Sequence, residues 1–127
     1  MNEDMLTTAR QLAAHPDWEW RPGMRWCFPR GGRGISAEDL NAHGCDAGRV
    51  LAEEEGWGAA GAPDGAVPDL TDDATGGTLM GALLPLISQP HIHVSTSGKC
   101  RLYADQGWWA GTTLAHAAAK AWLAVHS

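Results

Sequence analysis

The spacing of apolar residues predicts three helices. Apolar positions at helical intervals indicate a first helix over residues 4–14. A Leu-rich second helix is expected over residues 71–84, with Asp72 at the positive end of the helix dipole. An Ala-rich third helix begins after Thr112 or Thr113 and carries one apolar stripe.

Strands are expected between these helices. Residues 91–96 alternate apolar and polar side chains, which predicts a half-buried strand with residues 100–104 as its hairpin partner. A third short strand carries Trp108 and Trp109, and an earlier strand is expected over residues 24–28. The predicted fold is α+β: a small single domain with an antiparallel meander of three to four strands and the N-terminal, central and C-terminal helices on one face.

The middle of the chain has no clear period. Ser36 and Asp39 form a capping box for a short helical turn, and residues 49–53 fit either a strand or a helix. Residues 56–68 (GWGAAGAPDGAVP) predict a long loop that is either a lid over a site or slack chain.

Length, charge and cysteine content narrow the class of protein. The 127 residues suffice for one domain, and the formal charge of -6 disfavours strong binding of duplex nucleic acid. Prolines interrupt the longest uncharged stretch, residues 74–98, so no membrane span is expected. Three cysteines and an acidic N-terminus without a signal pattern predict a reducing, cytoplasmic location.

The aromatic content is unusual, with seven Trp against one Phe and one Tyr. A buried Trp needs a partner for its indole N–H, so some of these residues are expected to face a ligand or partner rather than the core. Trp108 and Trp109 are adjacent on a predicted strand and therefore point to opposite faces. One of the two is expected at the surface.

Residues 20–34 form a basic segment with four arginines and no acid in an otherwise acidic chain. Arginine forks bind phosphate, glycines let the backbone approach an anion, and indole rings stack on bases. The alternative is that these arginines pair with acids of the same chain. The candidate ligand-binding residues are Trp20, Arg21, Arg25, Trp26, Arg30, Arg33, His91, His93, Trp108 and Trp109.

Two closely spaced residue pairs have side chains that can bind a metal ion. His43 with Cys45 and His91 with His93 could supply four zinc ligands, although their spacing matches no familiar zinc pattern. His93 with Ser95 also fits the H-x-S/T pattern of two-histidine phosphoesterases, but a second copy is missing. The prediction is therefore no resident metal and no cofactor, with a zinc-dependent hydrolase or phosphodiesterase as a weaker alternative.

Three segments carry a family resemblance: residues 18–24 (WEWRPGM), 68–77 (PDLTDDATGG) and 111–115 (GTTLA). They resemble an uncharacterised family of small phage-encoded proteins with W-x-W-x-P-G-M and P-D-L-x-D-x-A-T-x-G motifs. The chain departs from that pattern at Asp73, where the family has Pro, and at Gly76, where it has Leu. The resemblance implies a phage context and the host cytoplasm, and it supplies no catalytic residues.

These observations together predict a non-enzymatic phage accessory protein. It would bind and sequester a small anionic ligand, a nucleotide immune signal, and thereby inhibit host antiviral defence. The alternative is a protein inhibitor that occludes a host defence enzyme through exposed Trp and the acidic residues 53–55. A homo-oligomer is also expected, because so many Trp in a small chain favour an exposed apolar patch.

Overall fold

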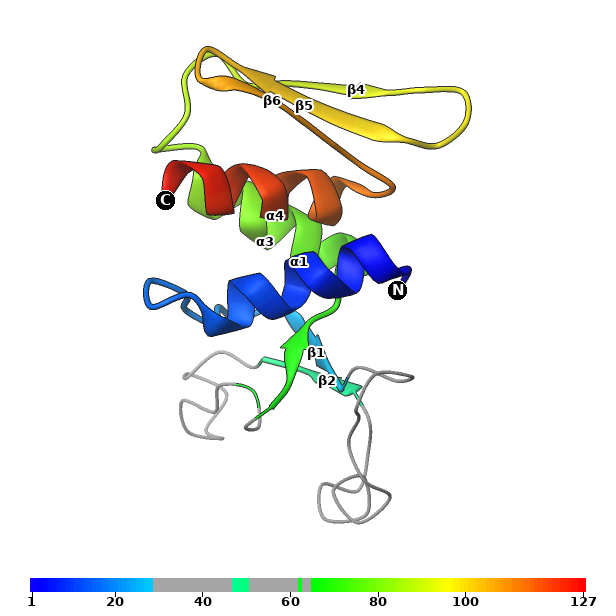
Figure 1. Cartoon of the computed structure of the whole chain (residues 1–127), viewed down its shortest axis with the longest axis vertical. Helices are drawn as coiled ribbons and strands as arrows, with labels where there is room; N and C mark the ends of the chain where they lie inside the picture. Colours follow the sequence, from blue (N-terminus) through cyan, green and yellow to red (C-terminus); the bar gives the residue numbers. More distant parts are fainter. Residues whose placement is uncertain (29–46, 51–61, 63–64) are drawn as a thin grey trace.

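The computed structural model describes residues 1–28, 47–50, 62 and 65–127 (Figure 1). The helices in this part of the chain are α1 (Glu3–Ala14), α3 (Asp73–Leu83) and α4 (Leu114–Val125). The strands are β1 (Arg25–Cys27), β2 (Ala47–Arg49), β3 (Val67–Pro68), β4 (His91–Val94), β5 (Cys100–Ala104) and β6 (Gly107–Gly111). No helix among these is long and apolar enough to cross a bilayer.

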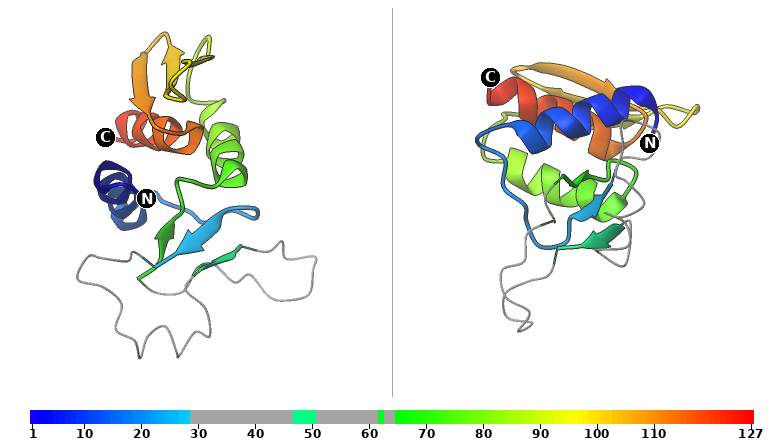
Figure 2. Two further views of the ribbon diagram at one scale, coloured as in Figure 1. Left: turned by 90° about the vertical axis from the view of Figure 1, so that its right-hand side faces the viewer. Right: turned by 60° about the horizontal axis from the view of Figure 1, so that its bottom comes forward.

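The strands form two antiparallel three-stranded sheets with the helices between them (Figures 1 and 2). The first sheet has the order β2-β1-β3, and the second is the β4-β5-β6 meander. Helix α4 packs on β5 and β6, α3 packs on α4, and α1 contacts α4 and β3. The α+β class, the meander and the three helices are confirmed, whereas the earlier predicted strand belongs to a separate sheet.

The first sheet contains two segments, β2 and β3, whose sequences have no helix-like or strand-like spacing of apolar residues. β1 pairs along its two edges with β2 and with β3, and β3 is the end of the predicted loop 56–68. The rest of that loop lies outside the described residues, except for Ala62, Gly65 and Ala66. β1 lies within the largely apolar run 24–28, which predicted a strand. β2 and β3 are short and lie in no such run, so the sequence pattern did not predict them.

Each helix begins at a polar side chain that accepts a backbone N–H of the first turn. Oδ1 of Asn2 accepts from Met5 at 2.8 Å, and Oδ2 of Asp72 accepts from Thr75 at 2.9 Å. Oγ1 of Thr113 accepts from the His116 N–H at 3.0 Å. These contacts satisfy N–H groups that the helix itself leaves unpaired, and they fix the helix starts within one or two residues of the predicted positions.

Small residues allow α3 and α4 to pack closely. A Cβ built on Gly76 would lie 3.1 Å from the backbone nitrogen of Ala115, so a larger residue would push the helices apart. Four alanines of α4 are completely buried at this interface and under the second sheet: Ala117, Ala118, Ala119 and Ala121. Gly76 therefore lies where α3 meets α4.

Large apolar residues from all three helices and from both sheets meet in one core. Its fully buried members include Leu12, Met24, Leu70, Leu79, Leu83 and Leu102. Trp122 is also in the core, and four other indoles pack partly buried against it: Trp18, Trp20, Trp26 and Trp109. Leu therefore fills the centre of the core, and the indoles cover its edge.

Candidate functional site

Three aromatic rings form a row across the outer face of the second sheet. His91 lies directly opposite Tyr103, and Tyr103 lies opposite Trp108, on three neighbouring strands. The ring centroids are 6.2 Å apart for the first pair and 6.4 Å for the second. We call His91, Tyr103 and Trp108 the ring row. The helices lie on the other side of this sheet, so nothing in the described chain covers the row (Figure 2).

The alternation of side chains along β5 and β6 produces this arrangement. Leu102 is fully buried toward α4, whereas its neighbour Tyr103 points outward. Trp109 pairs with Leu102 and packs on the core, while Trp108 is 59% exposed. The prediction that only one indole of this pair enters the core is confirmed, and Trp108 is the exposed member.

Positive charge accompanies the rings. The Arg101 guanidinium carbon lies 5.7 Å from the Trp108 ring centroid, within cation–π distance, and Nη1 lies 3.5 Å from the Tyr103 hydroxyl. His93 is the direct cross-strand neighbour of Arg101. Strands β4, β5 and β6 contain no Asp or Glu, although the chain as a whole has a charge of -6. The outer face therefore combines stacking surfaces with donors for an anion.

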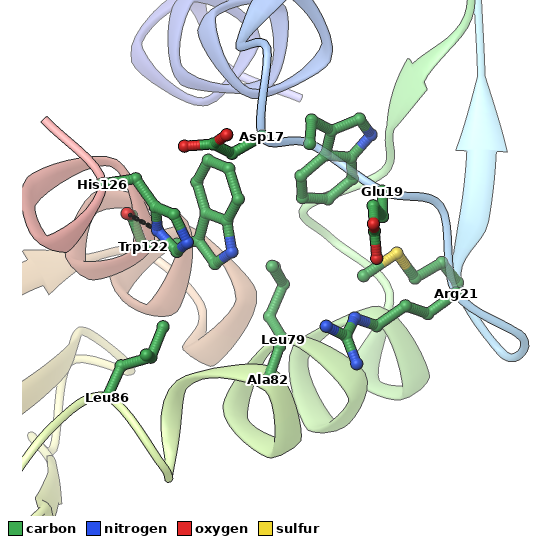
Figure 3. Close-up of a pocket in the computed structure, with 10 residues that line it drawn as sticks. Asp17, Glu19, Arg21, Leu79, Ala82, Leu86, Trp122 and His126 are labelled. Carbon is green, nitrogen blue, oxygen red and sulfur yellow. Dashed lines mark hydrogen bonds between the residues drawn. The ribbon is translucent and has the colours of Figure 1, made fainter.

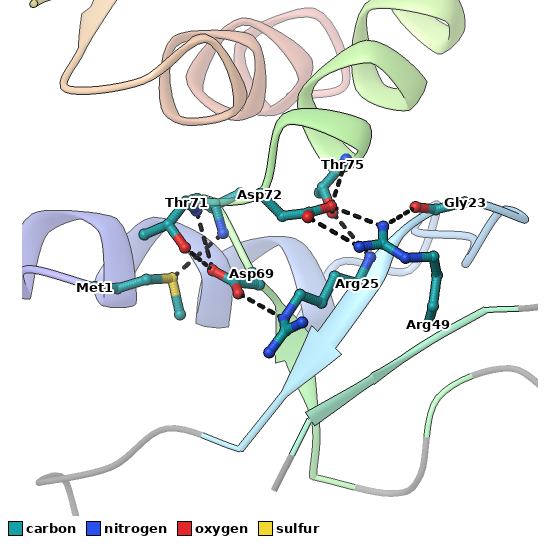
Figure 4. A network of polar contacts seen from close by, with 9 residues as sticks. Met1, Gly23, Arg25, Arg49, Asp69, Thr71, Asp72 and Thr75 are labelled. Carbon is teal, nitrogen blue, oxygen red and sulfur yellow. Dashed lines mark hydrogen bonds and ion pairs between the residues drawn. The ribbon is translucent and has the colours of Figure 1, made fainter.

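In the described part of the basic segment, Arg25 contacts an acid of the same chain and is not free to bind a phosphate. Nε of Arg25 lies 3.1 Å from Oδ2 of Asp69, and the backbone N–H of Arg25 donates to Oγ1 of Thr75 at 2.8 Å. Figure 4 shows this ion pair beside a second one, between Arg49 and Asp72. Arg25 thus pairs with an acid of the same chain, which was the alternative explanation for the arginine cluster.

The two indoles of that segment, Trp20 and Trp26, are half-buried and pack against the core. Trp26 lies edge to face with Phe28 at 5.6 Å, and its ring passes so close to Gly48 that a Cβ there would lie 2.6 Å from it. Trp20 lies edge to face with Trp18 at 5.5 Å. Neither Trp26 nor Trp20 is part of the ring row, so the predicted ligand residues are divided among separate regions.

Several predicted residues lie outside the described part of the chain. These are Arg30, Arg33, His43, Cys45 and the acidic residues 53–55. Among the described residues, no cluster of three or more His, Cys, Asp or Glu could hold a metal ion. His91 and His93 share one face of β4, as their spacing predicted. The prediction that this strand is half-buried is wrong, because Ile92 and Val94 on the other face are exposed as well: β4 is an edge strand.

The two described cysteines are held as thiols. Burial, together with the nearby Asp69 carboxylate, raises the pKa of Cys27 to about 11. Burial also raises the pKa of Cys100, which lies in the core. Because the thiolate is the nucleophilic form, neither side chain has the environment of a reactive cysteine.

Tyr103 and Arg101 were not among the predicted site residues. Both lie on β5, whose buried alternate residues Cys100 and Leu102 imply that positions 101 and 103 face outward. The alternation alone could have identified them as exposed, but only the register places them beside Trp108.

Comparison of the chain with protein-family models, with curated proteins and with solved structures found no match.

Proposed function

We propose that this protein is a non-enzymatic nucleotide-binding protein whose site is the outer face of β4, β5 and β6. The observation that carries the proposal is the ring row with Arg101 beside Trp108. A base stacks on the exposed indole of Trp108 or on Tyr103, and the phosphate accepts hydrogen bonds from Arg101 and His93. Stacking tolerates any base, because each base has a π face. The contacts of Arg101 and His93 with the phosphate then make the site prefer nucleotides to uncharged nucleosides.

In the biological setting that we propose, binding is the whole activity. The resemblance to small phage-encoded proteins and the absence of a predicted catalytic set both favour a protein that sequesters a nucleotide immune signal in the host cytoplasm. Removing the free signal would inhibit host antiviral defence without any chemical step.

A protein inhibitor is the second candidate, because the same face also has the composition of a binding hot spot. Trp and Arg dominate such hot spots, and Trp108 is 59% exposed next to Arg101. In this case a host defence enzyme would cover the ring row, and its binding would be independent of nucleotide. Pull-down from host lysate with wild-type protein and with Trp108→Ala separates the two functions.

A homo-oligomer also remains part of the proposal. Four exposed apolar residues lie at the end of α3 and along β4: Leu84, Leu86, Ile92 and Val94. β4 pairs only with β5 in the described chain, so its other edge is open to a second copy. Size-exclusion chromatography with light scattering tests this, and a species of 13.5 kDa would exclude it.

The binding experiment is a titration of the purified protein with AMP, ATP, ADP-ribose and a cyclic dinucleotide, followed by Trp fluorescence and calorimetry. Loss of a stacking partner costs about 1–3 kcal/mol, so Trp108→Ala should weaken nucleotide binding about 5- to 150-fold. Arg101→Ala should weaken it and reduce the dependence of affinity on salt.

A matched control variant lies on another element. Arg10→Ala removes an exposed arginine on α1. This variant should bind nucleotide as the wild type does. The proposal is wrong if no nucleotide in the panel binds saturably, or if Trp108→Ala and Arg101→Ala retain wild-type affinity.

A further inference from the structure

A pocket on the side of the molecule brings together residues that the proposed function does not use (Figure 3). It lies between the segment after α1 and the C-terminal parts of α3 and α4, and its empty volume is about 360 Å³ with the solvent at its mouth included. Leu79, Met24 and Ala82 form its buried floor. Two indoles, Trp18 and Trp122, also line it.

The two indoles are held at a right angle. Their ring centroids are 5.6 Å apart and their planes cross at 81°. His126 stacks on Trp122 at 3.8 Å and 19°, and His15 contacts the same indole edge to face at 5.0 Å. Trp20 contacts Trp18 in the same way at 5.5 Å. The aromatic walls are therefore fixed before any ligand arrives, which lowers the entropic cost of binding.

Charged groups of both signs line the same pocket. Asp17 and Glu19 are exposed carboxylates, and Arg21 is an exposed guanidinium with no ion pair among the described residues. In Figure 3, Asp17 lies next to Trp122 and His126, whereas the Arg21 guanidinium extends toward Leu79 on the other side. Asp17 and the aromatic rings therefore mark one end of this space, and Arg21, with Glu19 on the same side, marks the other.

His126 adds an acceptor rather than a donor. Its Nδ1 lies 2.8 Å from the backbone oxygen of Trp122, and because a carbonyl only accepts, Nδ1 carries the proton. In the neutral ring Nε2 then has a free lone pair. The Asp17 carboxylate, an imidazole acceptor and the electron-rich indole rings together favour a cation at this end of the pocket.

We propose that this pocket binds a small zwitterion, an ammonium group joined to a carboxylate by a short carbon chain. The ammonium lies against Trp18 and Trp122 near Asp17, and the carboxylate pairs with Arg21. This site is separate from the ring row, so it stands whether or not the protein binds nucleotides.

Glycine betaine is the probe, because its quaternary ammonium suits an aromatic wall and its carboxylate suits Arg21. Binding is followed by Trp fluorescence and by calorimetry of the full chain. 3,3-Dimethylbutanoate has nearly the same shape and the carboxylate but no positive charge, and choline has the quaternary ammonium but no carboxylate. Betaine should bind saturably, and each analogue should bind at least about fivefold more weakly.

Variants assign the two ends of the ligand. Arg21→Gln should weaken betaine binding at least about fivefold and leave choline binding unchanged, because only the carboxylate contact is lost. Asp17→Asn should weaken both betaine and choline, because Asp17 lies at the ammonium end. The Arg21 and Asp17 side chains are exposed, so both variants should fold normally, which a thermal melt verifies. Arg10→Gln is the matched control for Arg21, and Trp108→Ala is the control for the ring row.

Three results would overturn the proposal. The first is no saturable betaine binding up to about 50 mM, far above the millimolar affinities of weak small-ligand sites. The second is equal affinity for betaine and 3,3-dimethylbutanoate, since that would show a pocket that selects shape alone. The third is wild-type affinity for betaine in Arg21→Gln. A failure of nucleotide binding at the ring row would leave all three readouts unchanged.

Discussion

Arg49 binds the carboxylate of Asp72 with two parallel contacts, Nη1 to Oδ2 at 2.9 Å and Nη2 to Oδ1 at 3.0 Å. The same Nη1 donates to the backbone oxygen of Gly23 at 2.7 Å. Since Asp72 is also the N-cap of α3, a single carboxylate joins the first sheet to the helical layer (Figure 4). This contact connects segments that lie far apart in the sequence.

Removing this contact should destabilise the fold modestly. Arg49→Ala loses a bidentate, charge-assisted pair, but the guanidinium is partly exposed and solvent screens it. We expect the free energy of unfolding to fall by about 1 kcal/mol, measured by urea denaturation. Arg10→Ala, which removes an exposed arginine on α1, should change it by less than about 0.5 kcal/mol. Equal effects of the two substitutions would contradict the structural role of Arg49.

The Asp72 carboxylate should also make stability depend on acid pH. The hydrogen bond from Arg49, with those from Thr75, lowers the pKa of Asp72 from 3.8 to about 2. The folded state therefore binds this proton more weakly than the unfolded chain does, so the stabilisation is complete above pH 3.8 and is lost as the pH falls toward 2. Urea midpoints measured between pH 5 and 2 should show a shallower slope in Asp72→Asn than in the wild type.

His116 should produce a second pH dependence nearer neutrality. Burial, and then the nearby Lys120 ammonium, lower the pKa of His116 below 6.5, although Asp4 at 3.0 Å partly opposes them. Nδ1 accepts the Thr112 N–H at 3.2 Å, so protonation of Nδ1 would break that contact. Stability should be complete above pH 6.5 and should fall as the pH drops below it, because the unfolded chain takes up the proton first.

The test is a series of urea midpoints between pH 8 and 5. His116→Asn keeps an acceptor opposite the Thr112 N–H but does not titrate, so its stability should change less over this range. His93→Asn is the matched control, because His93 is exposed on β4 and contacts solvent. The same slope in wild type and His116→Asn would exclude His116 as the source of the pH dependence.

Two glycine substitutions should have opposite effects. A Cβ on Gly111 would lie 2.7 Å from the backbone nitrogen of Ala117 and 2.7 Å from Cβ of His116, so Gly111→Ala should cost about 1–3 kcal/mol. Gly81 on α3 has nothing within 4 Å of the same position. Gly81→Ala should therefore stabilise the helix by about 0.5–1 kcal/mol, and thermal melts of both variants check the pair. A stable Gly111→Ala variant would show that α4 does not pack tightly at the end of β6.

The adjacent indoles Trp108 and Trp109 should separate stability from binding. Trp109→Ala removes a ring that packs on the core and should lower the free energy of unfolding by about 2–3 kcal/mol. Trp108→Ala removes a ring that is 59% exposed and should change it by less than about 0.5 kcal/mol. Urea denaturation of both variants measures the difference. A large loss of stability in Trp108→Ala would mean that this indole supports the sheet rather than a ligand.

The sequence determined the local elements of this protein. The helix starts at Asn2, Asp72 and Thr113 and the alternation along β5 are encoded by residues a few positions apart, because capping and amphipathic packing act over one or two turns or pleats. That Trp108 and Trp109 face opposite sides follows from the same short-range geometry.

Only the tertiary structure decided how these elements meet. The pairing of β1 with β2 and β3, the binding of Arg25 by Asp69, and the placement of His91 opposite Tyr103 join residues 12 to 44 positions apart. Strand register and long-range ion pairs depend on how the whole chain buries its apolar surface, which no local pattern records. Of the predicted arginine cluster, the two described members are thus separated: Arg25 pairs with Asp69, and Arg21 lines a pocket. The outer-sheet site contains an arginine and a tyrosine that the linear pattern did not single out.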